Sequence, residues 1–453
     1  METSVQRLRY ILEVLAPAVG SSKKSATLPI LQNVVVGQGR AYAMNLETAV
    51  TVEFPEATDD PLLLPHQQVL HLLRHIPAAT RLSINQEGEF IKLTAGATGA
   101  DFPVPGEVAE FPPLPKLQPV GEGQVDADLF LKTATALAPY AATDTSRPVL
   151  QCVCVTLGDP LEMVGADGFR LAWQIIPMAL PALGSPATGL KHLLLPTAAV
   201  AALARVWKVM EKQPTMSTQE EADPLKKDGG FRMAMLAVAK RMATVKFTPT
   251  HLSFHHGAVT VWTQLTEGEF PNYQQLIPTN LPLKVTFDAE EALRAVRSLA
   301  EVAVDGSGLV RLNWAGDRLM VSARAEEAGA LTTSIRAHIQ GGEGKIGFNM
   351  IGFNIRYLSD YLAGKLGMVM MESATPSSPA RFYHAGSPDV LLMPMFVSDP
   401  TAPTAEPAVA QQVPTDEDAP DEPPDDQQAP GDEEVPAEPA TAKPRARARR
   451  AKR

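Results

Sequence analysis

One local pattern occurs three times along the chain of 453 residues, and this repetition restricts the possible folds more than any other feature. Each copy begins with an amphipathic segment of about twelve residues, at positions 4–16, 126–138 and 288–300. A Ser or Asp opens each segment, and its side chain can accept hydrogen bonds from the N–H groups of a first helical turn. The pattern therefore predicts three similar units, as in a ring or an array, rather than one enzyme pocket.

A β-branched run follows each predicted helix, at positions 30–36, 149–157 and 309–314, and a Gly or Asp turn and a second strand come next. The predicted unit is thus a helix followed by a β-hairpin. Two further helices are predicted at 65–76 and 196–210, where Leu-Leu-Leu-Pro phrases end at Pro65 and Pro196. Proline is tolerated in a first helical turn because its missing N–H would have no partner there.

The spacing of a third phrase indicates an insertion in the second copy. Glu-Phe-Pro ends at Pro112 and again at Pro271, about 47 residues after Pro65 but about 75 residues after Pro196. We place the insertion at about 212–241, where the chain is polar and charged. The predicted domains are then 1–120, 121–281 and 282–397.

The two cysteines indicate a reducing compartment. Cys152 and Cys154 lie two apart in a predicted strand, and we expect their side chains to point to opposite faces and not to form a disulfide. No apolar run approaches the length of a membrane span. These features predict a soluble cytoplasmic protein.

The C-terminal segment differs in composition from the rest of the chain. Pro, Ala, Asp and Glu dominate from about 398 to 442, and 443–453 is strongly basic. Such a segment cannot bury enough apolar surface to offset its ordering entropy, which predicts a disordered tail. Because much of the net charge of −11 lies in this tail, the average charge does not exclude nucleic-acid binding by the rest.

Five phrases in order and spacing identify a resemblance. They are Leu-Pro-Ile-Leu from Leu28, Ala-Asp-Gly-Phe-Arg-Leu from Ala166, Glu-Gly-Glu-Phe-Pro-Asn-Tyr from Glu267, Phe-Asn-Ile-Arg-Tyr from Phe353, and Leu-Met-Pro-Met from Leu392. Together they resemble the bacterial DNA polymerase III sliding clamp, the beta subunit, over about residues 1–397.

This resemblance implies an α+β fold of three clamp domains, with helices that line a hole and antiparallel sheets outside. Two chains would close head to tail into a ring around double-stranded DNA, as a homodimer without base recognition. The resemblance further implies a non-catalytic processivity subunit in DNA replication, without a cofactor and associated with the nucleoid. Topological linkage would hold the DNA, so a mildly positive lining suffices.

The resemblance also implies a partner pocket between the second and third domains. There the DNA polymerase III alpha subunit, the clamp loader and repair proteins would dock short linear peptides of the Gln-Leu-x-Leu-Phe type. Phe169 and Gln275 depart from the family pattern, which predicts a shifted peptide preference. The implied pocket residues are Leu150, Ala166, Gly168, Phe169, Arg170, Leu171, Pro271, Gln275, Leu276, Asn354, Tyr357, Leu391, Leu392, Met393, Pro394, Met395 and Phe396.

Basic residues on the predicted helices and nearby loops are the candidates for the DNA-facing surface. Helix faces commonly carry charge, and Glu13, Glu290 and Glu291 dilute the positive charge. The candidates are Arg7, Arg9, Lys23, Lys24, Arg74, Lys132, Arg147, Arg205, Lys208, Arg294, Arg297, Arg356 and Lys365.

Two alternatives remain open. His71 and His75 have the i, i+4 spacing of metal ligands on a helix, although the sequence around them has no third histidine or Glu-rich context. A clamp-like scaffold that binds proteins without encircling DNA is the second alternative, and the acidic balance and the insertion favour it slightly.

Overall fold

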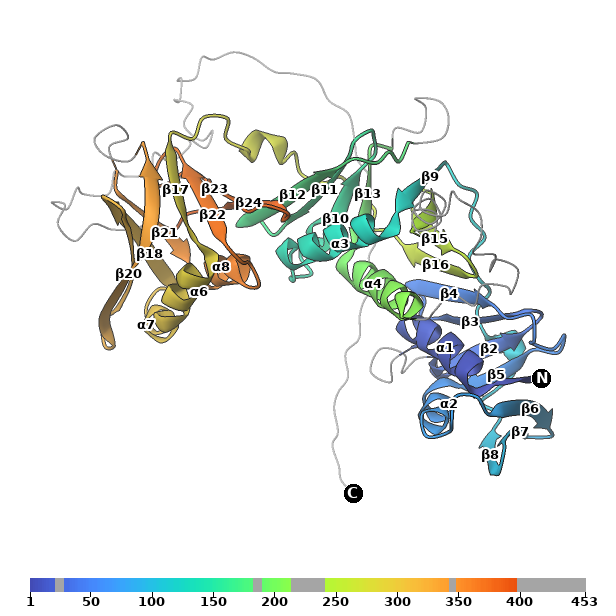
Figure 1. The fold of residues 1–453 in the computed structure, drawn as a ribbon. Helices are drawn as coiled ribbons and strands as arrows, with labels where there is room; N and C mark the ends of the chain where they lie inside the picture. The colour runs from blue at the N-terminus through green and yellow to red at the C-terminus, as the bar shows by residue number, and fades with distance from the viewer. Residues whose placement is uncertain (21–27, 182–189, 213–240, 342–347, 397–453) are drawn as a thin grey trace, which may run out of the picture. The chain divides into compact units, whose positions relative to one another are not determined.

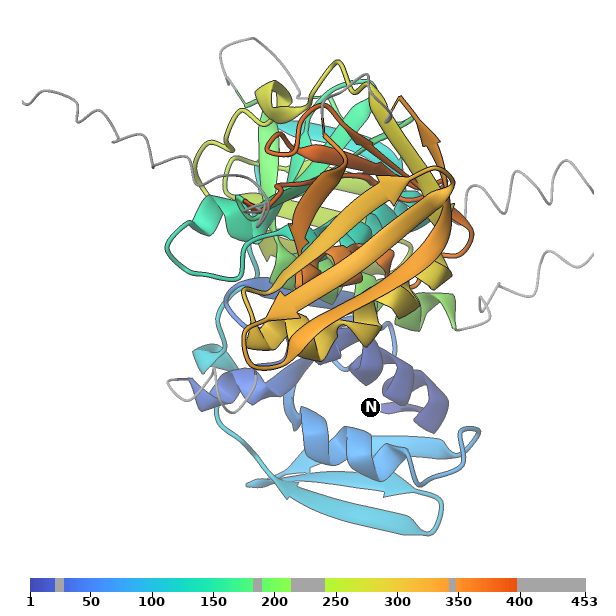
Figure 2. The ribbon, with the colours of Figure 1, turned by 90° about the vertical axis from the view of Figure 1, so that its left-hand side faces the viewer.

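The computed structural model describes residues 1–20, 28–181, 190–212, 241–341 and 348–396, and Figures 1 and 2 show these segments in two orientations. The structure refines the predicted repeat: each copy contains two halves with the order strand, helix, three strands, and only the first half of the third copy has a second helix after the first. In the first copy these are β1 (Glu2–Ser4), α1 (Val5–Leu15), β2 (Asn33–Gly37), β3 (Arg40–Met44) and β4 (Thr48–Glu53), then β5 (Leu62–Pro65), α2 (His66–Leu73), β6 (Arg81–Glu87), β7 (Phe90–Ala95) and β8 (Thr98–Pro103).

The second and third copies repeat this order. The second contains β9 (Gly121–Asp126), α3 (Ala127–Leu137), β10 (Cys152–Thr156), β11 (Leu161–Ala166) and β12 (Arg170–Ile176), then β13 (His192–Pro196), α4 (Thr197–Glu211), β14 (Met242–Phe247), β15 (His251–His256) and β16 (Val259–Gln264). The third contains β17 (Leu283–Asp288), α6 (Ala289–Ser298), α7 (Ala300–Asp305), β18 (Leu309–Ala315), β19 (Arg318–Ala325) and β20 (Gly329–Gln340), then β21 (Met350–Asn354), α8 (Ile355–Leu362), β22 (Met368–Ser373), β23 (Ala380–Tyr383) and β24 (Asp389–Leu392).

Main-chain pairing joins successive copies. Strand β4 of the first copy pairs antiparallel with β16 of the second, which makes an 8-stranded sheet. Strand β12 of the second copy pairs antiparallel with β24 of the third, within a 12-stranded sheet. We call these two pairings the first and second seams. In both seams, the last strand of the second half of one copy pairs with the last strand of the first half of the preceding copy.

The helices pack on these sheets through apolar faces. Helix α1 contacts β3 and β4, α3 contacts β11 and β12, and α6 contacts β17 and β20. Helix α4 also packs against α1 and α3, and α6 packs against α8. In Figure 1, α1 and α4 lie side by side near the first seam.

The three predicted helix starts are confirmed. The side chain of Ser4 accepts from the N–H of Arg7 at 3.2 Å, and that of Asp126 accepts from the N–H of Leu129 at 3.0 Å. Asp288 accepts from the N–H groups of the second and third residues of α6. Each cap satisfies a donor that the first turn leaves free, and this is why the helices begin where the sequence predicts.

Two details of the predicted elements are wrong. Pro65 and Pro196 do not lie inside first helical turns but end β5 and β13 and precede α2 and α4 with an extended backbone. The runs predicted as strands from positions 30 and 149 begin instead with 3-10 turns, at Pro29–Gln32 and Pro148–Gln151. Proline at the start of each turn fixes the backbone angle that such a turn needs. The third run is a strand, β18, as predicted.

The prediction for the cysteines is also wrong in its geometry. Cys152 and Cys154 lie on the same face of β10, because side chains two apart in a strand share a face. Both are buried free thiols in a cluster with Trp173, Tyr273 and Leu391. Burial raises the pKa of Cys154 to about 12, so this thiol is not a nucleophile near neutral pH.

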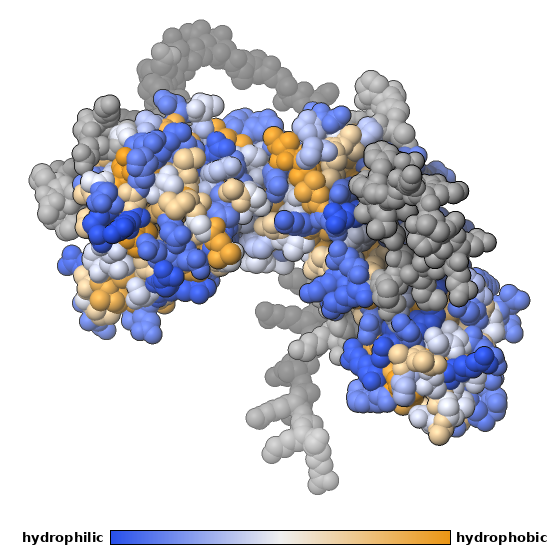
Figure 3. Space-filling model, in the orientation of Figure 1, coloured by the Kyte–Doolittle hydropathy of each residue, from blue (hydrophilic) through white to orange (hydrophobic). Residues whose placement is uncertain are grey.

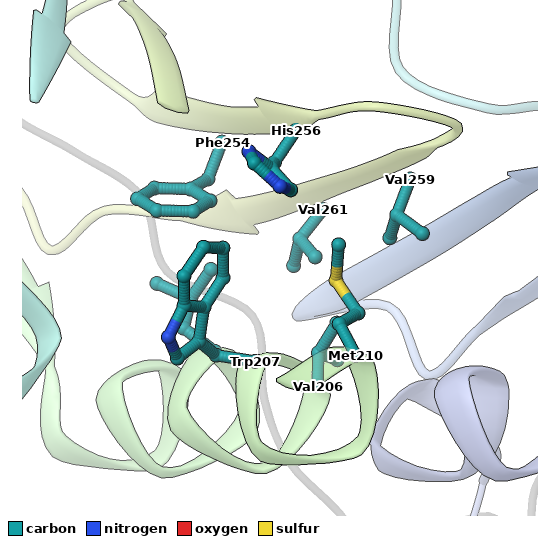
Figure 4. Close-up of a pocket in the computed structure, with 8 residues that line it drawn as sticks. Val206, Trp207, Met210, Phe254, His256, Val259 and Val261 are labelled. Carbon is teal, nitrogen blue, oxygen red and sulfur yellow. The ribbon is translucent and has the colours of Figure 1, made fainter. Parts of the chain in front are cut away.

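Helix α4 covers the hairpin of β15 and β16 and leaves a small cavity beneath it (Figure 4). The cavity, of only about 10 Å³, is lined by apolar side chains and His256. Trp207 points its ring at that of His256, with centroids 4.9 Å apart, and its indole N–H donates to Asp128 at 2.6 Å. Asp128 also pairs with Arg241 at 3.1 Å. Arg241, at one end of the predicted insertion, and Trp207, in the helix before it, are thereby both held to Asp128 of α3. Residues 213–240 and the predicted tail 398–453 lie outside the described residues.

Candidate functional site

The predicted partner pocket lies at the second seam. A cavity of about 60 Å³ opens beside the paired ends of β12 and β24 and is almost entirely apolar. Eight of its nine lining residues are among those predicted. The nine are Ala166, Gly168, Phe169, Arg170, Leu171, Leu276, Pro379, Leu391 and Met393.

The loop between β11 and β12 builds one wall. The Asp167 carboxylate accepts from the N–H groups of Phe169 and Arg170, both at 2.9 Å, and this Asx turn fixes the loop. Gly168 has φ +93°, a conformation that L side chains rarely adopt, and an added Cβ would lie 2.9 Å from the Arg147 guanidinium. The turn leaves the ring of Phe169 59% exposed at the rim.

Arg170 connects this wall to helix α8 of the third copy. Its guanidinium donates to Asp167 at 2.8 Å, to Asp360 at 3.2 Å and to the carbonyl of Pro139 at 2.8 Å. It also lies 4.6 Å from the ring centroid of Tyr357, a cation–π distance. With only 12% of its side chain exposed, Arg170 is a fixed part of the wall.

Strand β24 and the residues after it build the opposite wall. Leu391 faces the pocket and Leu392 faces the main core, as alternation in a strand requires. The family resemblance also implies that 391–396 is a strand, but the strand ends at Leu392, because the main chain then leaves the sheet near Pro394, which lacks an N–H. Met393 is 41% exposed, and its N–H donates to the carbonyl of Phe169 at 2.9 Å.

Several predicted pocket residues lie outside the lining. Leu150 and Leu392 are buried in the packing, and Asn354 caps α8. Tyr357 stacks on Phe169 at 6.4 Å and supports the rim. Met395 bridges to Gly352, and Phe396 is 90% exposed. The remaining three, Pro271, Gln275 and Pro394, are exposed or half-buried.

Sequence reasoning missed Pro379. It precedes β23, and the pairing of Ala380 with Leu392 brings it to the pocket. No phrase of the resemblance includes this proline, so only the register of β23 on β24 could reveal its place.

Most basic candidates lie exposed or half-buried on the helices. Eight of them form no ion pair with any residue that the structure describes: Arg9, Arg74, Lys132, Arg205, Lys208, Arg294, Arg297 and Arg356. Figure 3 shows hydrophobic residues in small separate patches among hydrophilic ones on the face in view.

The other basic candidates are engaged or lie elsewhere. Arg7 approaches Glu56 at 4.0 Å, and Arg147 pairs with Asp144 at 3.4 Å. Lys365 lies over the ring of Tyr361 at 4.2 Å, and burial lowers its pKa to about 8. Lys23 and Lys24 lie outside the described residues.

The described segments contain no group of three or more His, Cys, Asp or Glu side chains that could hold a metal ion. The rings of His71 and His75 lie with their centroids 5.0 Å apart and their planes tilted by 59°, and no third ligand joins them among those segments. None of the helices in the described segments has the length and hydrophobicity needed to cross a membrane.

The chain is similar to beta sliding clamps along most of its length, although no family model matches it. The beta sliding clamp of Caulobacter vibrioides is 22% identical over 407 residues, which cover 87% of this chain and 96% of the relative. That of Synechococcus elongatus is 23% identical over 346 residues, covering 74% and 82%.

Solved structures agree with this similarity. The DNA polymerase III beta subunit of Thermotoga maritima matches with a TM-score of 0.70 at 19% identity, covering 88% of this chain and 99% of that one. A Pseudomonas aeruginosa sliding clamp bound to griselimycin matches with a TM-score of 0.69 at 17% identity, covering 88% and 99%. The resemblance predicted from the sequence is thereby confirmed: the chain has the α+β fold of the DNA polymerase III beta subunits, and its curated homologues are beta sliding clamps.

Proposed function

We propose that this protein is a DNA sliding clamp, a non-catalytic processivity subunit that encircles duplex DNA and tethers the replicative polymerase and other partners. The observation that carries this proposal is the pair of equivalent seams within one chain, β4 with β16 and β12 with β24. A structure that joins its copies by the same pairing twice is suited to closing a ring with the same pairing again.

The strands for a third seam are β20 and β8. By their place in the halves, β20 corresponds to β4 and β12, and β8 corresponds to β16 and β24. Strand β8 ends its 4-stranded sheet, and along 329–336 β20 pairs only with β19 among the described strands. Leu331 on β20 is 46% exposed and Phe90 beside β8 is 48% exposed. We infer a head-to-tail homodimer in which β20 of each chain pairs with β8 of the other.

The division into three domains, 1–120, 121–281 and 282–397, belongs to the same proposal. It is supported by β9 and β17, which begin the second and third copies at Gly121 and Leu283.

The exposed basic side chains on the helices support a DNA-facing role for that surface. Without ion pairs to described residues, they are free to attract phosphates at a distance and through water. Loose contact of this kind permits sliding, because no base is read and no phosphate is held tightly.

We expect Arg294→Glu with Arg297→Glu, on α6, to shorten retention on nicked circular DNA severalfold and to flatten its salt dependence. The exchange of two positive for two negative charges reverses the local attraction for phosphates. Retention is measured by gel filtration of the loaded DNA at several salt concentrations. The control is Arg311→Glu with Arg324→Glu, on the strands β18 and β19. Equal retention of both double variants would contradict a lining role for α6.

The apolar pocket at the second seam supports a docking role: it would bind short apolar peptides that belong to partners such as the polymerase alpha subunit, the clamp loader and repair proteins. Burial of one Leu and one Phe stabilises such a complex by roughly 1.5 to 3 kcal/mol each before ordering costs. Exposed Met393 offers an adaptable contact. The resulting affinity is expected to be micromolar, which lets partners exchange.

We expect a labelled Gln-Leu-Ser-Leu-Phe peptide to bind the full chain with a micromolar Kd and Met393→Ala to weaken it about tenfold, because about 1.4 kcal/mol of apolar contact is lost. Fluorescence anisotropy measures both. The matched control is Met320→Ala, since Met320 is 38% exposed on β19, away from the pocket. Binding that is equally strong in all three proteins would contradict this pocket as the peptide site.

A clamp-like scaffold that does not encircle DNA is the second candidate. The two differ in one measurement: an encircling protein stays on nicked circular DNA and is released when the circle is cut. A cytoplasmic location near the nucleoid follows from the proposed function.

A further inference from the structure

A second, larger cleft lies at the first seam, beside the paired ends of β4 and β16. Its volume is about 680 Å³, and it is lined by residues of the first and second copies. Its walls are the loop before β4, the end of β16 and the start of α4. One copy further along the chain, the corresponding elements at the second seam are the loop before β12, the end of β24 and the start of α8.

Hydrogen bonds establish the equivalence of the two sites. Asn45 accepts from the N–H groups of Glu47 and Thr48 at 3.2 and 2.8 Å, as Asp167 does from Phe169 and Arg170. The N–H of Gln264 donates to the carbonyl of Glu47 at 2.8 Å, as that of Met393 does to Phe169. Glu47 therefore stands in the place of Phe169, Thr48 in that of Arg170 and Gln264 in that of Met393.

The same equivalence explains why the cleft is large. In the apolar pocket, Arg170 and Tyr357 fill the space between the loop and α8. Tyr357 is the third residue of α8, and the third residue of α4 is Ala199. Thr48 and Ala199 are too small to fill the corresponding space, so the first seam keeps an open cleft where the second has a closed wall.

Side chains in the cleft select a different ligand from the apolar pocket. Glu47 and Glu267 bring two exposed carboxylates to the rim, and the cleft has no cationic side chain among its described lining residues. Gln264, Gln151 and several threonines add hydrogen-bonding groups. Helix α4 opens on the cleft without a side-chain cap, so its first N–H groups can donate to main-chain carbonyls of a ligand.

The backbone at Leu46 is a further sign of a binding rim. Leu46 occupies the place of Gly168 with φ +76°, in the left-handed region that leucine rarely adopts, and its side chain is 58% exposed. A left-handed, exposed leucine is unfavourable for folding alone, and such residues concentrate at binding sites. It offers an apolar contact next to the carboxylates.

We propose that the cleft at the first seam is a second docking site, which takes an extended polar peptide segment carrying Lys or Arg side chains from a partner protein. The basic side chains pair with Glu47 and Glu267, the peptide carbonyls accept from the first turn of α4, and Leu46 covers the aliphatic part of a basic side chain. Two classes of peptide then bind one chain at separate seams, and neither needs the other to leave. This inference goes beyond the proposed function and does not require that DNA be encircled.

The test uses the full chain and a fluorescein-labelled Ser-Lys-Ser-Arg-Ser-Lys peptide, with unlabelled Gln-Leu-Ser-Leu-Phe at saturation to occupy the apolar pocket. We expect saturable binding, weakened about fivefold or more by Glu47→Gln with Glu267→Gln, as the loss of two rim ion pairs implies. The matched control is Glu301→Gln with Glu326→Gln, which removes the same charge from exposed sites in the third copy. The control should change the affinity less than twofold.

A second variant, Glu47→Phe with Gln264→Met, gives the cleft the rim residues of the apolar pocket and is expected to abolish binding of the basic peptide. Absence of saturable binding to the unaltered chain, or equal weakening by the two Glu→Gln pairs, overturns the proposal. Labelled Gln-Leu-Ser-Leu-Phe is titrated separately on each variant. It reports the apolar pocket and the integrity of the fold, so failure of the proposed function is distinguished from failure of this inference.

Discussion

Replacing Leu331 by aspartate is expected to convert the proposed two-chain ring into single chains. Leu331 lies on the part of β20 that no described strand covers on its outer edge, and it is 46% exposed in the single chain. In the inferred third seam it becomes buried against β8, which itself carries Asp101. Loss of the apolar contact and a new like-charge contact together cost about 3 kcal/mol, which raises the dimer dissociation constant by more than about a hundredfold.

Sedimentation velocity at low micromolar concentration measures the change in mass, and retention on nicked circular DNA measures its consequence. The control is Met320→Asp, which places the same charge on the neighbouring strand β19, where both edges are already paired. A dimer that persists in Leu331→Asp would show that the chains associate through another surface. A monomer in both variants would point to general destabilisation of the third copy.

The second large effect is expected for Arg170→Ala. The substitution removes the ion pairs to Asp167 and Asp360, the hydrogen bond to Pro139 and the cation–π contact with Tyr357. It also leaves Asp167, only 13% exposed, without its cationic partner. Because Asp360 is 54% exposed and partly screened by water, we expect a loss of about 2 to 3 kcal/mol rather than the full cost of breaking a buried pair.

Urea denaturation followed by tryptophan fluorescence measures this loss, because Trp173, one of the four tryptophans, is buried in β12 beside the second seam. Arg170→Lys should recover only part of the stability, since an ammonium group cannot reproduce the planar fork that reaches two carboxylates and a carbonyl. Arg324→Ala, at an exposed arginine on β19, is the control and should change the free energy of unfolding by less than about 0.5 kcal/mol. If Arg170→Ala resembled this control, Arg170 would not fasten the seam.

The features of the fold that depend on neighbours along the chain could be predicted from the sequence. Helix starts at Ser4, Asp126 and Asp288 follow from caps within three residues, and the repeat follows from their recurrence. Pairing between copies could not be predicted this way, because the partner of β4 lies more than 200 residues away. The strand alternation that places Cys152 and Cys154 on one face was available in the sequence, and the prediction for these two residues applied it wrongly.

The partner pocket likewise has parts that the sequence predicts and parts that depend on long-range strand pairing. Residues in phrases shared with the family, such as Phe169 and Met393, line the pocket as predicted, although their binding role stays a prediction. Pro379 was missed because its place depends on the register of β23 against β24. The polar cleft was missed as well, since small residues such as Thr48 and Ala199 leave no motif.

The seams are made by main-chain hydrogen bonds, and every non-proline residue carries the same N–H and C=O groups. Apart from Arg170, whose side chain also fastens the second seam, side chains along β4, β12, β16 or β24 can therefore be substituted while the main-chain pairing between copies persists. Sequence divergence can then alter the side chains at each seam while the architecture persists. This tolerance is consistent with a chain that aligns with 96% of the length of a relative with which it shares 22% identity. It also lets the two equivalent seams diverge into sites of different specificity.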